Sequence, residues 1–231
     1  MANKESVPNH LGLILDGNRR WAKAHNLSSF EGHKQGYDNL KVIAKHAINS
    51  GVNYVSAYIF SLENWNRSKK EVDYLMRLAY RMLTRDVKEL NDEGIRIFWL
   101  GSKQKISQKL LKAINAAEEI TKNNKRGNLC ICFNYSGYQE IIDAFIKIID
   151  KKIPKNKIDI SVVEDNLYGK DIPKIDFMVR TSGEQRISNF MLWRINYSEL
   201  YFTEKHWPAF TKTDLNRAFK EYSKRERRFG K

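Results

Sequence analysis

The first residues able to do chemistry together follow a short apolar run near the start of the chain. Leu11–Leu15 is too short for a helix and is typical of a buried strand, and the hexapeptide Asp16–Trp21 comes directly after it. A carboxylate that can hold Mg²⁺, a flexible glycine and two arginines entering a helix are what a diphosphate site needs. The hexapeptide also fits a simple turn in which Asp16 caps a helix and both arginines are solvated. Taken alone, these six residues slightly favour the simple turn over a diphosphate site.

A second group of the same kind follows the predicted strand Phe177–Arg180. Arg180, Arg186 and several hydroxyl side chains surround Gly183, and this composition suits a second anion. Taken singly, these residues also fit an ordinary turn and surface, and Glu199 fits either a metal ligand or an exposed carboxylate. Two basic sites in one chain suggest an enzyme that brings two phosphorylated substrates together.

Helix-like and strand-like segments alternate along the chain, and they must position these two groups. Strands are expected at Leu11–Leu15, Tyr54–Phe60, Ile95–Leu100, Leu129–Phe133 and Phe177–Arg180, and helices at about Gly36–Gly51, Val72–Leu90, Ile106–Thr121, Gln139–Asp150 and Thr213–Arg228. Such alternation requires parallel strands joined by right-handed crossovers, and ligands of such sheets bind beyond the carboxyl ends of the strands. We therefore predict a single α/β domain over residues 1–231, with a short polar tail at 1–8 and a central, mostly parallel sheet flanked by helices.

Composition excludes several classes of protein. The 231 residues include 41 Lys and Arg against 27 Asp and Glu, a net charge of +14, and 42% are hydrophobic. Such a chain folds, and no segment is apolar for long enough to cross a bilayer. Because the polar start Met1–Pro8 lacks the core of a signal peptide, we expect a cytoplasmic protein. Cys130 and Cys132 lie two apart in a predicted strand, so we expect them to share a face as buried apolar residues without a disulfide.

The positive charge suggests a nucleic-acid-binding protein as the alternative to an enzyme. The arginines, however, gather at strand ends together with the carboxylates Asp16 and Glu199, and the sequence contains no RNA-binding aromatic motif. We therefore expect no nucleic-acid partner. Solvated lysines, and a weak peripheral attraction to anionic membrane lipid, account for the excess charge.

A series of short motifs from about His10 to Gly230 resembles the cis-prenyltransferases, the family of undecaprenyl diphosphate synthase. The motifs are Asp16–Ala22, Gly32-His33, Phe60–Arg67, Asn134-Tyr135, Arg180–Glu184, Arg186–Phe190 and Glu199–Phe202. The resemblance implies a parallel sheet with a hydrophobic product tunnel, which the helix Val72–Leu90 would line with Leu75, Ala79 and Leu83. It also implies a Mg²⁺-dependent condensation of isopentenyl diphosphate with an allylic diphosphate such as farnesyl diphosphate, giving cis double bonds.

The resemblance also assigns roles to individual residues. It implies that Asp16 binds Mg²⁺ and acts in the chemical step with Asn64, which we expect to orient a proton path because an amide is a poor base. Glu199 would complete the metal site. Substrate contacts are implied for Gly17, Asn18, Arg19, Arg20, Trp21 and His33 around the allylic diphosphate, for Ser61, Leu62, Glu63, Trp65 and Arg67 near the reacting carbons, and for Arg180, Arg186, Ile187 and Ser188 around isopentenyl diphosphate.

The resemblance further implies a homodimer. The family's closing Arg-x-Gly is matched by Arg228-Phe229-Gly230, within the basic segment 224–231. In this interpretation Arg228 reaches across the dimer interface to the isopentenyl diphosphate of the partner chain.

Two positions depart from the family pattern. Ser29 stands where an arginine that holds the allylic diphosphate is common, and Gln185 stands where many bacterial members have a histidine. The first departure weakens binding of the allylic diphosphate, unless Arg19 or Lys34 compensates. The second affects a metal or phosphate contact made from position 185. Neither change removes an expected catalytic carboxylate.

Two bulky residues bear on product size. Ile59 and Phe133 stand where long-chain members have small residues, which predicts a product shorter than undecaprenyl diphosphate if their side chains point into the tunnel. Strand alternation gives each side chain about an even chance of facing the tunnel or the other side of the sheet. Ile59 lies two residues before Ser61 and so shares its face, which favours the tunnel for Ile59.

Overall fold

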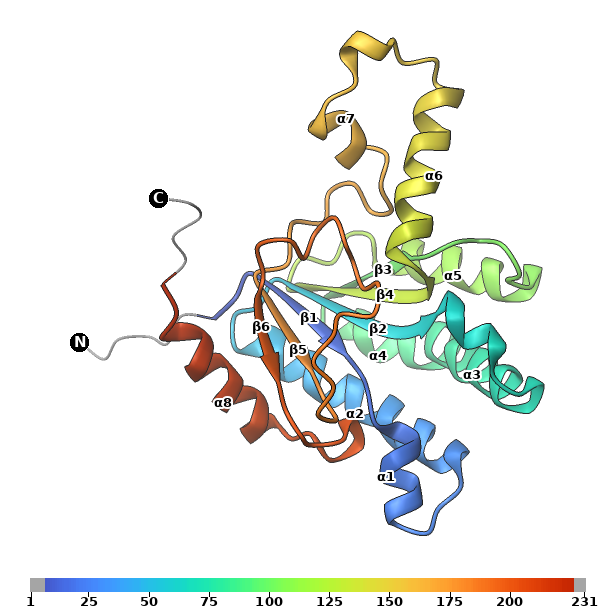
Figure 1. The fold of residues 1–231 in the computed structure, drawn as a ribbon. Helices are drawn as coiled ribbons and strands as arrows, with labels where there is room; N and C mark the ends of the chain where they lie inside the picture. The colour runs from blue at the N-terminus through green and yellow to red at the C-terminus, as the bar shows by residue number, and fades with distance from the viewer. Residues whose placement is uncertain (1–6, 227–231) are drawn as a thin grey trace.

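The computed structural model describes residues 7–226, which form an α/β domain around a six-stranded sheet (Figure 1). The strands are β1 (His10–Ile14), β2 (Tyr54–Ser61), β3 (Ile95–Leu100), β4 (Gly127–Tyr135), β5 (Phe177–Arg180) and β6 (Glu199–Phe202). Their order is β3-β4-β2-β1-β5-β6, and every neighbouring pair is parallel. The predicted parallel α/β sheet is confirmed.

Most helices lie in the connections between these strands, as is typical of a parallel sheet, whereas the connection from β5 to β6 contains no helix and α8 follows β6. They are α1 (Asn18–Ala24), α2 (Ser29–Asn49), α3 (Lys69–Arg81), α4 (Val87–Asp92), α5 (Gln108–Thr121), α6 (Gly137–Asp150), α7 (Ile160–Glu164) and α8 (Lys212–Ser223), with short 3₁₀ turns η1 (Leu62–Asn66), η3 (Lys155–Lys157) and η4 (Trp207–Ala209) and a π turn η2 (Met82–Asp86). None of the helices within residues 7–226 is long and apolar enough to span a bilayer.

Three elements differ from the sequence-based expectation. The edge strand β6 was not predicted, because its residues Glu199–Phe202 are not a fully buried apolar run like the equally short β5. Helix α2 begins at Ser29 instead of Gly36, because the Ser28 side chain accepts from the backbone N–H of Glu31 and the Glu31 side chain accepts from that of Ser28. The helix expected over Val72–Leu90 is interrupted by the π turn η2.

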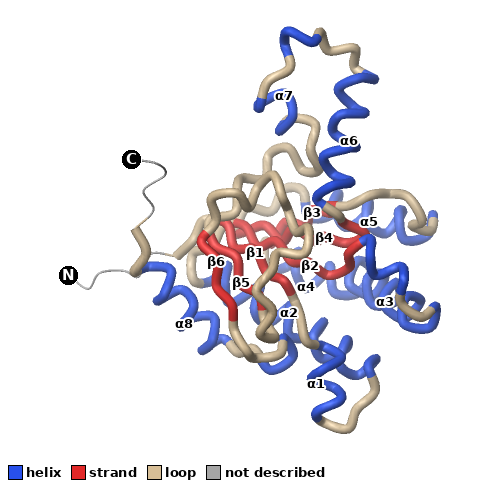
Figure 2. Tube along the Cα trace, in the orientation of Figure 1, coloured by secondary structure: helices blue, strands red, loops and turns tan. Residues whose placement is uncertain are grey.

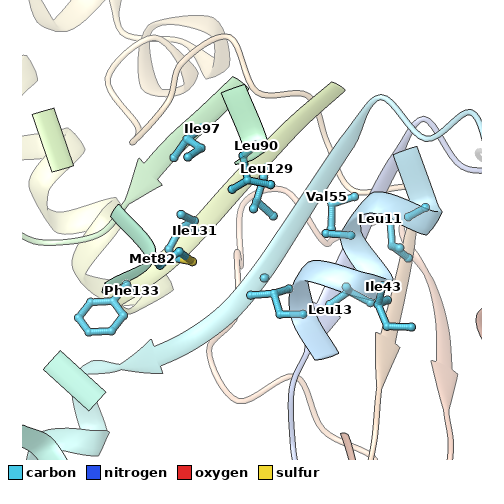
Figure 3. Close-up of a cluster of buried hydrophobic side chains, with 14 of the residues drawn as sticks. Leu11, Leu13, Ile43, Val55, Met82, Leu90, Ile97, Leu129, Ile131 and Phe133 are labelled. Carbon is cyan, nitrogen blue, oxygen red and sulfur yellow. The ribbon is translucent and has the colours of Figure 1, made fainter. Parts of the chain in front are cut away.

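The two faces of the sheet are covered differently. One face packs under α2, α3, α4, α5 and α8, where side chains from neighbouring strands interlock with those of the helices (Figures 1 and 3). The other face is covered mainly by irregular chain between Ile172 and Ile195. Cys130 and Cys132 both lie on this second face, buried and unbonded, as expected from their spacing.

Helix α6 and the short α7 project away from the sheet (Figures 1 and 2). The base of α6 is anchored by Glu140, whose Oε1 lies 2.8 Å from Nη1 of Arg194 in a fully buried ion pair. Ala144 and Ile148 pack toward α7, but another face of α6 remains exposed.

The strand register determines where the polar loops meet. Ile14 at the end of β1 pairs with Tyr58 of β2 and with Arg180 at the end of β5. Because the three strands run in the same direction, the loops that follow them emerge at one edge of the sheet. The two groups of charged residues found in the sequence are therefore brought together at that edge.

Candidate active site

A polar cavity of about 540 Å³ lies at the carboxyl ends of β1 and β2. The largest share of its wall comes from the β1–α1 loop and the first turn of α1, and the rest from the end of β1, from α2, β2, η1 and the residue after it, and from the loop after β5. Its lining residues are Ile14, Leu15, Asp16, Gly17, Asn18, Arg19, Arg20, His33, Tyr58, Ile59, Ser61, Asn64, Arg67, Glu184, Arg186 and Ser188. Eleven of the residues that the resemblance assigned to catalysis or substrate binding are in this set.

Asp16 is the carboxylate at the centre of the cavity wall. Its Oδ1 lies 3.1 Å from Nη2 of Arg20, and its Oδ2 lies 3.0 Å from Nη2 of Arg180. Burial raises the pKa of Asp16, but the hydrogen bonds and positive charges of Arg180 and Arg20 outweigh burial and leave that pKa below its ordinary value. Asp16 is therefore ionised at neutral pH, as a metal ligand must be.

A glycine makes the turn after Asp16 possible. Gly17 caps α1 with φ 102°, in the left-handed region that favours glycine. A Cβ at this position would also lie 2.6 Å from Oγ of Ser182 and 2.9 Å from Nδ1 of His206. Any larger residue would push the start of α1 out of the cavity wall.

The loop after β5 supplies the second group of charges. Buried Arg180 donates from Nη1 to the hydroxyl of Ser188 at 2.8 Å and to the backbone carbonyl of Arg186. Glu184 pairs with Arg186 and, at 3.1 Å, with Arg20 of α1. Arg180 shapes the loop from beneath, and the side chain of Arg186, paired with Glu184 and 60% exposed, lines the cavity.

A buried carboxylate that the motifs did not point to holds the other side of the cavity. Oε1 of Glu71, in the first turn of α3, lies 2.9 Å from Nε2 of His33 and 2.9 Å from Nη1 of Arg67. Its Oε2 lies 3.8 Å from Nη1 of Arg19. Three lining residues from three different elements are thus joined through one side chain.

Burial and the Glu71 contact together decide the charge and the tautomer of His33. Burial raises the pKa of Glu71, yet the hydrogen bond from His33 and the charge of Arg67 leave that pKa below its ordinary value. Burial lowers the pKa of His33, and this effect exceeds the opposing hydrogen bond to Glu71. An ionised carboxylate only accepts, so neutral His33 donates from Nε2 and keeps Nδ1 as an acceptor.

Asn64 lines the cavity from the 3₁₀ turn η1. Its Oδ1 accepts from the backbone N–H of Ser61 at 3.3 Å, which fixes the orientation of the amide. The next residue, Trp65, points elsewhere. Its Nε1 donates to Oδ1 of Asn134 at 2.6 Å and its ring packs edge-on against Phe60, so the structure places it behind the cavity wall.

Other residues with expected substrate contacts do not line the cavity. Trp21 stacks on His25 at 4.3 Å, and Arg180 acts through Asp16 and the loop it supports. Three further residues with expected substrate contacts, Leu62, Glu63 and Ile187, are not among the residues that line the cavity. Ser29 and Gln185, the two departures from the family pattern, do not line the cavity either. Arg228 lies outside the described residues, as does most of segment 224–231.

Glu199 is not brought to Asp16. It begins β6 and pairs with Phe177 at the start of β5, whereas Asp16 follows the end of β1. Its Oε2 lies 2.8 Å from Nη1 of Arg225. Within one chain, the structure therefore gives no metal site shared by these two carboxylates.

Asp16 alone is still a suitable ligand for Mg²⁺. Across residues 7–226 no three His, Cys, Asp or Glu side chains form a cluster able to hold a metal. Mg²⁺, however, is commonly held by one or two carboxylates together with substrate phosphates and water. A hard, ionised carboxylate in the wall of a basic cavity fits that mode of binding.

A smaller, apolar cavity of about 50 Å³ adjoins the polar one. Leu15, Asn18, His33 and Ile59 line both cavities. The other residues of the apolar cavity are Gly36, Tyr37, Leu40, Leu75, Leu78, Ala79, Met82 and Trp207. The two cavities together provide adjacent places for a charged group and an apolar group of one ligand.

The two bulky residues singled out in the sequence take different positions. Ile59 lines both cavities. Phe133 lies on the helix-covered face but lines neither cavity, because its ring is packed between a stacked Phe60 ring at 5.0 Å and a tilted Trp99 ring at 4.9 Å. Of the tunnel residues expected from the long helix, Leu75 and Ala79 line the apolar cavity and Leu83 is buried outside it.

Sequence comparison relates the chain to known enzymes. A family model described as "Putative undecaprenyl diphosphate synthase" matches residues 14–230. The chain is 43% identical over 222 residues to an isoprenyl transferase of Rickettsia prowazekii (strain Madrid E), covering 96% of this chain and 97% of that protein. It is 44% identical over 226 residues to an isoprenyl transferase of Thermotoga maritima, covering 97% of both.

Solved structures agree with this relation. The crystal structure of lavandulyl diphosphate synthase from Lavandula x intermedia in complex with dimethylallyl diphosphate is similar with a TM-score of 0.92 and 36% identity, covering 97% of this chain and 99% of that one. The structure of a probable undecaprenyl diphosphate synthase from Campylobacter jejuni has a TM-score of 0.82 and 29% identity, covering 98% of this chain and 100% of that one.

Proposed function

Because this chain belongs to the undecaprenyl diphosphate synthase family and is a cis-prenyltransferase, we propose that it condenses isopentenyl diphosphate with a short allylic diphosphate in a Mg²⁺-dependent reaction. One observation carries the proposal. The polar cavity, with Asp16 held between Arg20 and Arg180, shares four lining residues with an adjoining apolar cavity. A charged diphosphate and its hydrocarbon tail need this combination.

The lining residues divide between the two substrates. Arg19, Arg20 and the backbone around Gly17 bind the allylic diphosphate, whose tail passes Ile59 into the apolar cavity. Arg186 and Ser188, on the loop supported by Arg180, bind isopentenyl diphosphate. Guanidinium groups form strong, charge-assisted hydrogen bonds with diphosphate oxygens.

In the proposed reaction, the bond between the allylic carbon and its diphosphate oxygen breaks as that carbon joins the terminal carbon of isopentenyl diphosphate. Negative charge builds up on the departing diphosphate, and the fixed charges of Arg19 and Arg20 stabilise it. Mg²⁺ held by Asp16 would add to this charge stabilisation when bound. The proton lost from the isopentenyl unit passes to diphosphate or water along a path that Asn64 orients, beside the free Nδ1 of His33.

The size of the apolar cavity supports a short product. The roughly 50 Å³ next to Ile59 is only about a third of the 150 Å³ or so that accepts benzene, so the apolar cavity leaves little room beyond a short tail that also extends into the polar cavity. Growth of a long chain would require the walls to move. We therefore propose that elongation stops well before the undecaprenyl length.

We also propose that the enzyme works as a homodimer through α6. Tyr138, Ile142, Phe145 and Ile149 lie on one stripe of this helix and are 68, 50, 47 and 72% exposed. The opposite side of α6 packs on α7, so the helix is apolar on both sides, which is typical of a helix buried on both sides. Charged residues at Phe145 and Ile149 should convert a dimer into a monomer in analytical ultracentrifugation, and an unchanged dimer would contradict this assignment.

The net charge of +14 supports a place in the cytoplasm beside anionic lipid, where a prenyl product would be released. Nothing in the arrangement of the site requires a nucleic acid.

The experiment that tests the function measures diphosphate release and prenyl products with isopentenyl diphosphate and starters of increasing length. We expect release only when both substrates and Mg²⁺ are present, and loss of release on chelation. A folded protein that forms no prenyl product with any starter would contradict the proposal.

A further inference from the structure

Tyr37 closes the apolar cavity on the side away from the diphosphate site. It lies on α2, one turn after His33, and lines the apolar cavity but not the polar one. Its hydroxyl donates to Oδ2 of Asp86, the last residue of the π turn η2. Nζ of Lys41 lies 3.3 Å from the same oxygen. The ring is therefore fixed at both ends, by its own helix and by the helix opposite.

We propose that Tyr37, held by Asp86, is a chain-length determinant of this enzyme: its ring blocks the advance of the prenyl chain between α2 and η2. This inference rests on the proposed function. A prenyl tail that enters past Ile59 moves away from the diphosphate and meets the Tyr37 ring within the length of the small cavity. Elongation ends when the next unit finds no space beyond the ring.

The hydrogen bond makes this ring a firmer barrier than an apolar side chain of the same size. To swing aside, Tyr37 must give up its acceptor at a half-buried position, and a partly desolvated hydroxyl left without a partner is costly. Burial and the Asp86 carboxylate both raise the pKa of Tyr37, so the hydroxyl keeps its proton to donate. The π turn is what places Asp86 opposite Tyr37, and such turns often occur at functional sites.

The surroundings of Tyr37 distinguish it from the other walls of the cavity. Leu40, Leu75 and Ala79 belong to the main core and are 2, 7 and 4% exposed, so space behind them is already filled. Behind Tyr37 lie the side chains of Lys41 and Asp86, which are 21 and 14% exposed. Removing the ring thus opens a passage toward the surface between α2 and η2, without emptying the core.

A matched set of variants distinguishes two roles for Tyr37: a ring that blocks the prenyl chain, and a contact with Asp86 that only links two helices. Tyr37→Ala removes the ring, Tyr37→Phe keeps the ring but loses the hydrogen bond, and Asp86→Asn keeps an acceptor. Lys45→Ala is the control, because Lys45 ties α2 to α4 and the residue after it through Glu89 and, at 2.7 Å, Glu93, away from both cavities. If Tyr37→Ala does not fold, Tyr37→Leu provides a smaller side chain that still fills part of the site.

Two measurements are made on each variant: the length distribution of the products, and the binding of non-reactive prenyl diphosphate analogues of increasing tail length. Tyr37→Ala should add at least one isoprene unit to the main product. It should also raise the affinity ratio of long to short analogues by about tenfold, as expected for burying roughly two more methylene groups. Tyr37→Phe should shift both readouts less, and Asp86→Asn and Lys45→Ala should leave both near those of the unchanged enzyme.

Unchanged product lengths and affinity ratios in folded Tyr37→Ala, or an equal shift in Lys45→Ala, would overturn the inference. Failure of the proposed function is seen separately, because the unchanged enzyme would then form no prenyl product at all. The analogue-binding ratio does not depend on turnover and still reports whether Tyr37 limits the length of a bound tail.

Discussion

The polar and apolar cavities share four residues but are built in different ways. The polar cavity is assembled from short loops at the ends of adjacent strands, and its charges are paired with one another. The apolar cavity is what remains between α2, α3 and the sheet after side chains have packed, and its size depends on single side chains such as Ile59 and Tyr37. We therefore expect the chemistry to depend on charges that local sequence encodes, and the product size to depend on packing that spans the fold.

The largest expected effect comes from Asp16, at the centre of the polar cavity. Asp16→Asn should lower kcat about a thousandfold or more, because it removes the charge needed to hold Mg²⁺ while keeping a side chain of the same shape. Product lengths from any residual turnover should not change. Steady-state kinetics and product sizing check both points, and near-normal turnover by a folded Asp16→Asn protein would contradict the assigned chemistry.

Asp16→Ala differs from Asp16→Asn in a way the structure makes clear. Arg180 is 4% exposed and loses its carboxylate partner in either variant, but alanine leaves its guanidinium without any hydrogen-bond acceptor at that position. We expect Asp16→Ala to melt at a lower temperature than Asp16→Asn, since an uncompensated buried charge is costly. The amide variant is thus the cleaner test of catalysis.

Glu71 should come next, because it acts on the polar cavity through other residues. Glu71→Gln keeps the shape but can donate to Nε2 of His33, which would move the His33 proton to Nδ1. We expect kcat to fall about ten- to a hundredfold, as is typical of residues that orient active-site groups, with a changed pH profile. A kcat and pH profile equal to those of the unchanged enzyme would show that Glu71 only stabilises the fold.

Ile59 and Phe133 test whether the apolar cavity limits the length of the product. Ile59→Ala should lengthen the products and leave the first condensation nearly unchanged, because Ile59 lines the junction of the two cavities. Phe133→Ala should instead cost about 3–5 kcal/mol of stability, since it empties a stacked position in the core. Product sizing and denaturant unfolding separate the two, and longer products from Phe133→Ala alone would reverse these assignments.

The smallest effect concerns the dependence of stability on pH. The pKa of Glu71 is below its ordinary 4.5 in the folded protein, so its contribution to stability is present above pH of about 4.5 and is lost as pH falls through the lower folded value. The melting temperature should therefore fall less steeply on acidification in Glu71→Gln than in the unchanged protein. Parallel curves for the two proteins would show that this carboxylate has the same pKa in both states.

Local sequence was enough to predict five of the six strands, the edge of the sheet where the loops meet and the charged loops. Asp16 and Arg180 follow apolar runs that are recognisable within a few residues, and a parallel sheet must bring their loops together. The motifs did not reveal Glu71, because its partner His33 lies 38 residues away and an acidic residue in the first turn of a helix is ordinary. The backbone N–H of Glu71 donates to Oγ of Ser68, which caps the start of α3. Glu71 therefore has an ordinary place in a helix cap, and nothing in the sequence marks its side chain as part of a site.

Other features depend on geometry that no short motif contains. The Tyr37–Asp86 contact requires the π turn η2, and the packing around Ile59 requires an irregular register between β2 and β4 at Tyr58 and Phe60. Glu199, by contrast, was assigned to the site by the resemblance. The resemblance placed it with Asp16 in one metal site, but the register of β6 keeps these two carboxylates apart within the chain.

The central claim is that one substrate spans both cavities, and a crystal structure with a non-reactive allylic diphosphate analogue tests it most directly. We expect the diphosphate within hydrogen-bonding distance of Arg19 or Arg20 beside Asp16, and the tail passing Ile59 to end against Tyr37. A diphosphate bound away from Asp16, or a tail leaving along the opposite face of the sheet, would contradict the account.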